Sequence, residues 1–109
     1  MRLHNIFQSL PAFQTAEVFE PLVDTPGLTL ERIVSNGQAT PPGEWYDQDH
    51  DEWVMVLTGS AGLLWAHIPQ VYTLTAGDYV YIPAHQCHRV EWTDKHQPTI
   101  WLALHIKAS

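Results

Sequence analysis

The sequence is poor in cysteine and in basic residues. A single cysteine, Cys87, excludes an intrachain disulfide. Only 5 Lys and Arg stand against 12 Asp and Glu, which gives a formal net charge of −7 at pH 7. A nucleic-acid partner is therefore not expected, because a negatively charged protein repels the phosphate backbone and the sequence has no basic stripe.

Long apolar runs are also missing. No segment approaches the roughly 20 apolar residues of a membrane span, and the first residues lack the apolar stretch of a signal peptide. We therefore expect a cytoplasmic protein with no membrane partner. The 109 residues are enough for one domain, and five Trp, four Tyr and three Phe supply side chains for a core or for the walls of a ligand cavity.

Short apolar or alternating segments, separated by turn signals, make up most of the sequence. They predict an all-β sandwich or barrel of about nine short strands, preceded by one helical turn at residues 9–14. The near-continuous apolar run of residues 53–58 is typical of a strand buried on both faces, and residues 59–62 are expected to form a turn. The predicted strands include residues 17–23, 28–35, 53–58, 63–67, 71–75, 79–82, 88–93 and 99–106.

Two segments concentrate the residue types that bind metals. Residues 45–52 are acidic and aromatic and lead directly into the apolar run. Residues 77–88 contain two histidines, His85 and His88, around a short predicted strand. A carboxylate from the first segment and imidazoles from the second can converge only if their strands are neighbours across a barrel interior.

The spacing within these segments resembles the two motifs of the cupin superfamily. Glu52 is followed after six residues by Gly59, and Gly77 is followed after five residues by Pro83 and then by His88. The resemblance covers roughly residues 28–105 and is closest to small, single-domain bacterial cupins. It implies a double-stranded β-helix, or jelly-roll barrel, with its active cavity inside.

The resemblance assigns Glu52 and His88 as metal ligands. The family's other two histidines lie four and six residues before the glutamate, where this chain has Gln48 and Tyr46. A rebuilt site would hold a divalent metal such as Fe, Mn, Ni, Cu or Zn. Its candidate ligands are Glu52, His88, Gln48, His85 (at a family glycine position) and His50.

Three further residues are expected to line the pocket. Tyr46 lies near the predicted barrel mouth, and alternation along residues 88–93 places Trp92 on the face of His88. His105 alternates with Trp101 and Ala103, so it either faces the cavity or is a structural histidine with a satisfied hydrogen bond.

Three functions are compatible with this pattern. The first is a metal-binding cupin that acts on a small organic molecule in its cavity, as an oxygenase or isomerase. The second is a metal-free module that binds a small ligand, favoured by the missing motif histidines. The third is a dimeric scaffold. The resemblance also implies a homodimer, in which residues 1–27 supply an N-terminal turn and a dimerisation strand and residues 28–109 form the barrel.

Overall fold

The computed structural model describes residues 1–11 and 16–107, and this part of the chain contains eight strands and no helix. The expected all-β fold is confirmed, with eight strands where about nine were predicted. The strands are β1 (Val18–Asp24), β2 (Leu28–Ser35), β3 (Asp51–Thr58), β4 (Ser60–Trp65), β5 (Ile68–Thr75), β6 (Tyr79–Ile82), β7 (His88–Thr93) and β8 (Thr99–Ile106).

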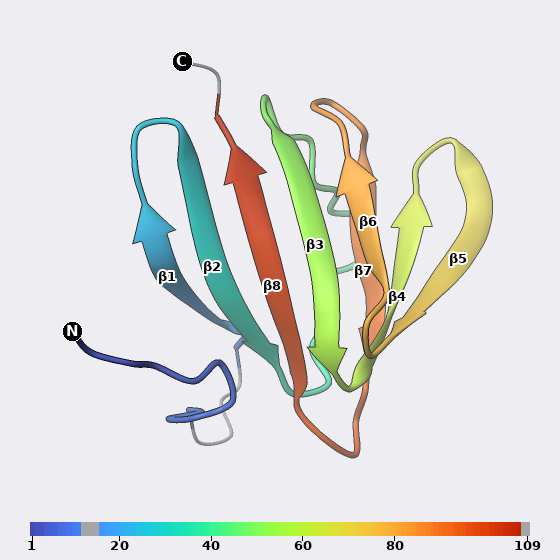
Figure 1. Cartoon of the computed structure of the whole chain (residues 1–109). Helices are drawn as coiled ribbons and strands as arrows, with labels where there is room; N and C mark the ends of the chain where they lie inside the picture. The colour runs from blue at the N-terminus through green and yellow to red at the C-terminus, as the bar shows by residue number, and fades with distance from the viewer. Residues whose placement is uncertain (12–15, 108–109) are drawn as a thin grey trace.

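The strands form two antiparallel sheets that make a jelly-roll barrel (Figure 1). The larger sheet has the order β1-β2-β8-β3-β6, and the smaller has the order β5-β4-β7. Strands distant in sequence therefore become neighbours, and β8 lies between β2 and β3. No helix in the described residues is long and apolar enough to cross a membrane.

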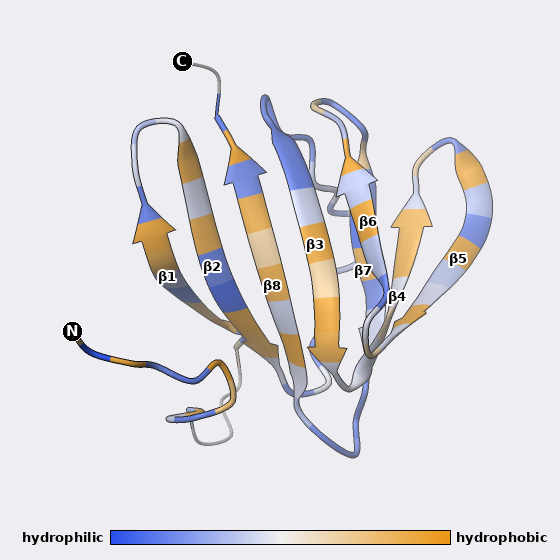
Figure 2. Cartoon of the chain, viewed as in Figure 1, coloured by the Kyte–Doolittle hydropathy of each residue, from blue (hydrophilic) through white to orange (hydrophobic). Residues whose placement is uncertain are grey.

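Apolar side chains from both sheets fill part of the barrel. Figure 2 shows that β3 begins hydrophilic and becomes apolar towards its end, so its polar start lies at one end of this core. The core residues are Val54, Val56, Ala61, Leu63, Leu74, Ile82, Trp101 and Ala103.

Two local predictions were wrong. Residues 59–62 do not form a turn, because only Gly59 has a positive φ (81°) and β4 begins at Ser60. Strand β3 is not buried on both faces, since fully buried Val54 and Val56 alternate with half-buried Trp53 and Met55. On the outer face of this strand, the ring of Trp53 packs 5.4 Å from that of Tyr79.

The first residues of the chain are attached to the outside of the larger sheet by Arg32. Its buried guanidinium donates to the carbonyl oxygens of Ile6, Gln8 and Ser9 at 2.7–3.2 Å and forms an ion pair with Glu20. Of the helical turn predicted at residues 9–14, the structure describes residues 9–11, which form a bend at Ser9 and no helix. Residues 12–14 lie outside the described part.

Candidate functional site

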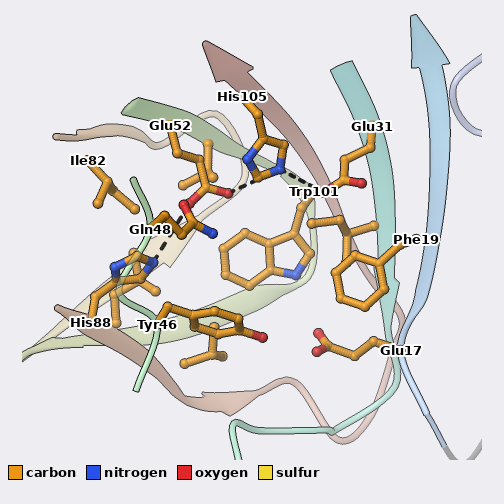
Figure 3. Close-up of a pocket in the computed structure, with 14 residues that line it drawn as sticks. Glu17, Phe19, Glu31, Tyr46, Gln48, Glu52, Ile82, His88, Trp101 and His105 are labelled. Atoms are coloured by element: carbon orange, nitrogen blue, oxygen red, sulfur yellow. Dashed lines mark hydrogen bonds and ion pairs between the residues drawn. The ribbon is translucent and has the colours of Figure 1, made fainter. Parts of the chain in front are cut away.

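A cavity of about 110 Å³ lies inside the barrel, beside the apolar core (Figure 3). Its walls combine carboxylates, imidazoles, aromatic rings and aliphatic side chains from both sheets and from the segment before β3. The lining residues are Glu17, Phe19, Glu31, Ile33, Tyr46, Gln48, Glu52, Val54, Leu63, Ile82, His88, Val90, Trp101 and His105.

Glu52 is the central polar residue of this cavity. It is only 7% exposed, because the alternation of β3 places it on the same inward face as Val54. One carboxylate oxygen lies 3.7 Å from Nε2 of His88, and the other lies 3.6 Å from Nε2 of His105. Burial raises the pKa of Glu52, and the nearby His105 and His88 oppose this effect.

His88 presents one nitrogen to the cavity. Its Nδ1 lies 2.8 Å from the backbone carbonyl of Gln86. Because a carbonyl can only accept, Nδ1 carries a proton, and Nε2 is the nitrogen that faces Glu52. The ring stacks on Tyr46 with centroids 5.5 Å apart, and the backbones of these two residues exchange two hydrogen bonds of 2.7 and 3.1 Å. The orientation of His88 is therefore fixed from two sides.

His105 lies between Glu52, Glu31 and His50. It lies opposite Glu52 in the pairing of β3 with β8 and opposite Thr29 in the pairing of β2 with β8. Its Nε2 lies 2.8 Å from a carboxylate oxygen of Glu31, and its Nδ1 lies 2.9 Å from Nε2 of His50. Both ring nitrogens thus have partners, as expected for a half-buried histidine with a fixed orientation.

A third carboxylate, Glu17, lies across the cavity from Glu52 (Figure 3). The hydroxyl of Ser35 donates a hydrogen bond to it, and the indole nitrogen of Trp101 donates to that hydroxyl at 3.1 Å. Burial is the main reason that the pKa of Glu17 is raised, and the Ser35 hydrogen bond lowers it in part.

Of the predicted site residues, the structure brings together Glu52, His88, Gln48, Tyr46 and His105 around the cavity. His50 precedes β3 and does not line the cavity, although its ring contacts that of His105. The predicted ligand His85 lies outside. Its φ is +64°, its side chain is 70% exposed, and its Nδ1 lies 2.9 Å from the Asp47 carboxylate. The family's glycine at this position is explained by the same left-handed backbone conformation.

Trp92 does not line the cavity, contrary to the expectation from alternation. The pairing of β4 with β7 changes register, so that Gly62 lies opposite Trp92 but Leu63 lies opposite Val90. This β-bulge adds one residue to β7 and turns Trp92 to the other face. There it packs over Gly62, where a Cβ atom would lie 2.2 Å from the indole nitrogen.

Among the lining residues that were not predicted from the sequence as site residues, four are charged or aromatic: Glu17, Phe19, Glu31 and Trp101. Glu17 precedes β1, Phe19 lies on β1 and Glu31 lies on β2, and none of these segments carries a recognised motif. One signal was available, because the alternation of β2 places Glu31 and Ile33 on the same face.

The donor set does not fit a resident metal. The described residues contain no group of three or more His, Cys, Asp or Glu side chains arranged to hold a metal ion. Gln48 and Tyr46 replace the two motif histidines, and Nε2 of His105 is already paired with Glu31. A catalytic site normally provides three protein ligands with an open position. Beside Glu52 and His88, the cavity offers only the neutral amide of Gln48 as a further predicted ligand, which is a weaker donor than the histidine of the motif.

The fold and site define a small β-barrel protein with a polar internal cavity. The family model described as "Cupin domain" matches residues 32–105. The chain therefore belongs to the cupin family, and the resemblance noted in the sequence is confirmed.

Solved structures agree with this assignment. A Ralstonia eutropha JMP134 protein, provisionally named a mannose-6-phosphate isomerase, is 47% identical over 99% of this chain and 100% of that chain, with a TM-score of 0.94. A cupin superfamily protein from Desulfitobacterium hafniense DCB-2 is 17% identical over 99% and 100%, with a TM-score of 0.75. The polyketide cyclase RemF of Streptomyces resistomycificus is 22% identical over 84% and 66%, with a TM-score of 0.71. The comparison with curated proteins gives no match.

Proposed function

We propose that this protein binds a small organic molecule in the barrel cavity and isomerises it by proton transfer, without a resident metal. One observation carries the proposal. A buried carboxylate, Glu52, faces the cavity between two imidazole nitrogens at 3.6 and 3.7 Å. Such a group can take and return a proton, and the raised pKa of Glu52 brings its basicity closer to that needed at neutral pH.

The reaction needs only groups that are present. Glu52 takes the proton from a carbon next to a carbonyl, and the electrons of that C–H bond form the C=C bond of an enediol. The carbonyl oxygen takes a proton from Nε2 of protonated His88. In the second half, the neighbouring hydroxyl returns a proton to His88, and the C=C electrons take the proton from Glu52 onto the other carbon. The protein ends as it began, and the substrate is isomerised.

Two observations favour this function over the alternatives from the sequence. Oxygen activation by an oxygenase needs a redox-active metal or another cofactor, and the donor set here is incomplete for a metal. A scaffold would have its interior filled and His88 exposed or bonded only to backbone, whereas Nε2 of the 5% exposed His88 faces Glu52. The 47% identical relative is also named as an isomerase, which supports the reaction class.

Deuterium uptake from solvent tests the proposal. The protein is incubated in D₂O with a panel of small aldoses, ketoses and amino sugars, and C–H exchange is followed by NMR. We expect exchange and isomerisation of at least one compound, and a fall of at least roughly 100-fold in rate for Glu52→Gln. Glu91→Gln removes the same charge from an exposed site on β7 and should leave the rate unchanged. No exchange with any compound, or equal rates in Glu52→Gln and wild type, would contradict the proposal.

A further inference from the structure

The charges around the cavity are almost all negative. Three carboxylates line it, from Glu17, Glu31 and Glu52, and no Lys or Arg is among the lining residues that the structure describes. Only His88 and His105 can carry a positive charge there, and His105 is paired with Glu31. At least one carboxylate therefore lacks a cationic partner.

Glu17 is that carboxylate. Its partner is the neutral hydroxyl of Ser35, and no ion pair to it is found among the described residues. Arg32 belongs to the opposite face of β2, where it pairs with Glu20. The Ser35–Trp101 hydrogen bond fixes the position of Glu17 without neutralising its charge.

Glu17 and Glu52 line the same cavity from opposite sides, so any ligand that enters it meets both carboxylates. A negatively charged ligand is repelled by them, and a cation is attracted.

Aromatic rings provide part of the apolar walls. Phe19, Tyr46 and Trp101 all line the cavity, and in Figure 3 the indole of Trp101 lies between Glu17 and Glu52. Aromatic faces attract organic cations, and they do so more strongly when the site is desolvated. The two largely buried carboxylates add charge-assisted contacts at either end.

We propose that the ligand of this cavity is a small organic cation, such as an amine-bearing or quaternary ammonium compound, and not a sugar phosphate. This inference rests on the proposed function, because it concerns the substrate of the same cavity. The volume of about 110 Å³ suits a molecule of modest size. The phosphate in the name of the Ralstonia eutropha relative would bring two further negative charges next to Glu17 and Glu52, with no Arg or Lys in the described lining to bind it.

Three probes test the inference by isothermal titration calorimetry at low salt. Choline and 3,3-dimethylbutan-1-ol have the same shape and differ in charge, and mannose 6-phosphate is the anionic probe. We expect choline to bind at least roughly tenfold more tightly than the neutral alcohol, and mannose 6-phosphate to bind more weakly than choline. Glu17→Gln should reduce the preference for choline by about fivefold, and Glu91→Gln should leave it unchanged.

The outcomes separate the two proposals. Equal affinities for choline and its neutral isostere, or tighter binding of mannose 6-phosphate, would overturn the cationic ligand but leave the isomerase proposal in place. Failure of all three probes to bind would also overturn it, and with no deuterium exchange in the substrate panel the proposed function would fail as well. The comparison of probes uses wild-type protein, so it holds even if Glu17→Gln does not fold.

Discussion

Individual residues in this barrel depart from the usual cupin pattern in a consistent way. Tyr46 and Gln48 replace two metal-binding histidines, so the site loses two nitrogen donors. Glu17 and Glu31 line the same cavity and give it negative charge. This exchange favours proton transfer and cation binding over metal coordination.

The first prediction concerns Glu17 and the pH dependence of stability. The pKa of Glu17 in the folded protein lies above its ordinary value of 4.5. Its contribution to stability is therefore fully present below pH 4.5 and is lost as pH rises through the folded pKa. Glu17→Gln removes this loss. Between pH 4.5 and 7, the free energy of unfolding of the variant should therefore rise relative to that of wild type.

Urea denaturation at a series of pH values measures this difference. The pKa of Glu52 is also raised, so the free energy of unfolding of Glu17→Gln should still fall in part as the pH rises. The exposed Glu91→Gln serves as the control and should follow wild type. A difference between Glu17→Gln and wild type that does not grow above pH 4.5 would contradict the burial of an ionisable Glu17.

At the scale of elements, strand positions were largely predictable from the sequence, and site geometry was only partly so. Strands β2 and β8 have the predicted bounds, because turn residues mark both ends. Glu52 and His88 were found from motif spacing. The convergence of Glu17 and Glu31 with them depends on β8 pairing with both β2 and β3, which no local pattern specifies. Likewise, the bulge that displaces Trp92 leaves no signal in the alternation.

Two motif glycines allow a matched test of why the motif needs glycine. Gly59 and Gly77 both have positive φ, but a Cβ atom on Gly59 would lie 2.5–2.8 Å from Thr99 and Pro98, whereas Gly77 has nothing within 4 Å. Gly77→Ala should cost about 1–2 kcal/mol for backbone strain alone. Gly59→Ala should cost about 1–3 kcal/mol more, because β4 must move away from β8.

Equilibrium denaturation of the two alanine variants gives both free energies. The test is the difference between the two losses in free energy of unfolding, since the cost of backbone strain is similar at both glycines. Equal losses of unfolding free energy would mean that the chain relieves the close approach of Gly59 to Thr99 at little cost. Backbone strain alone would then explain why both positions are glycine.

For the whole molecule, we propose the homodimer that the family resemblance implies, with β1 in the contact. Strand β1 is at the edge of the five-stranded sheet, and Phe19, Leu22 and Val23 are 41–52% exposed on it. An exposed apolar edge strand readily pairs with another chain. Light scattering after size-exclusion chromatography should give twice the mass of 12.4 kDa.

Leu22→Glu should convert this dimer into a folded monomer, because a buried unpaired charge at the contact is costly. Ile68→Glu, on an equally exposed residue of β5, is the matched control and should remain dimeric. A monomeric wild type, or a dimer unaffected by Leu22→Glu, would contradict the proposed contact.

The central claim is that Glu52 transfers a proton without a resident metal, and the rate of deuterium uptake by chelator-treated protein tests it most directly. The assay uses whichever panel compound wild type exchanges, before and after adding one equivalent of Fe, Mn, Ni, Cu or Zn. We predict the same rate in all samples and a loss of at least roughly 100-fold in Glu52→Gln. A rate that disappears on chelation and returns with one of these metals would contradict the claim.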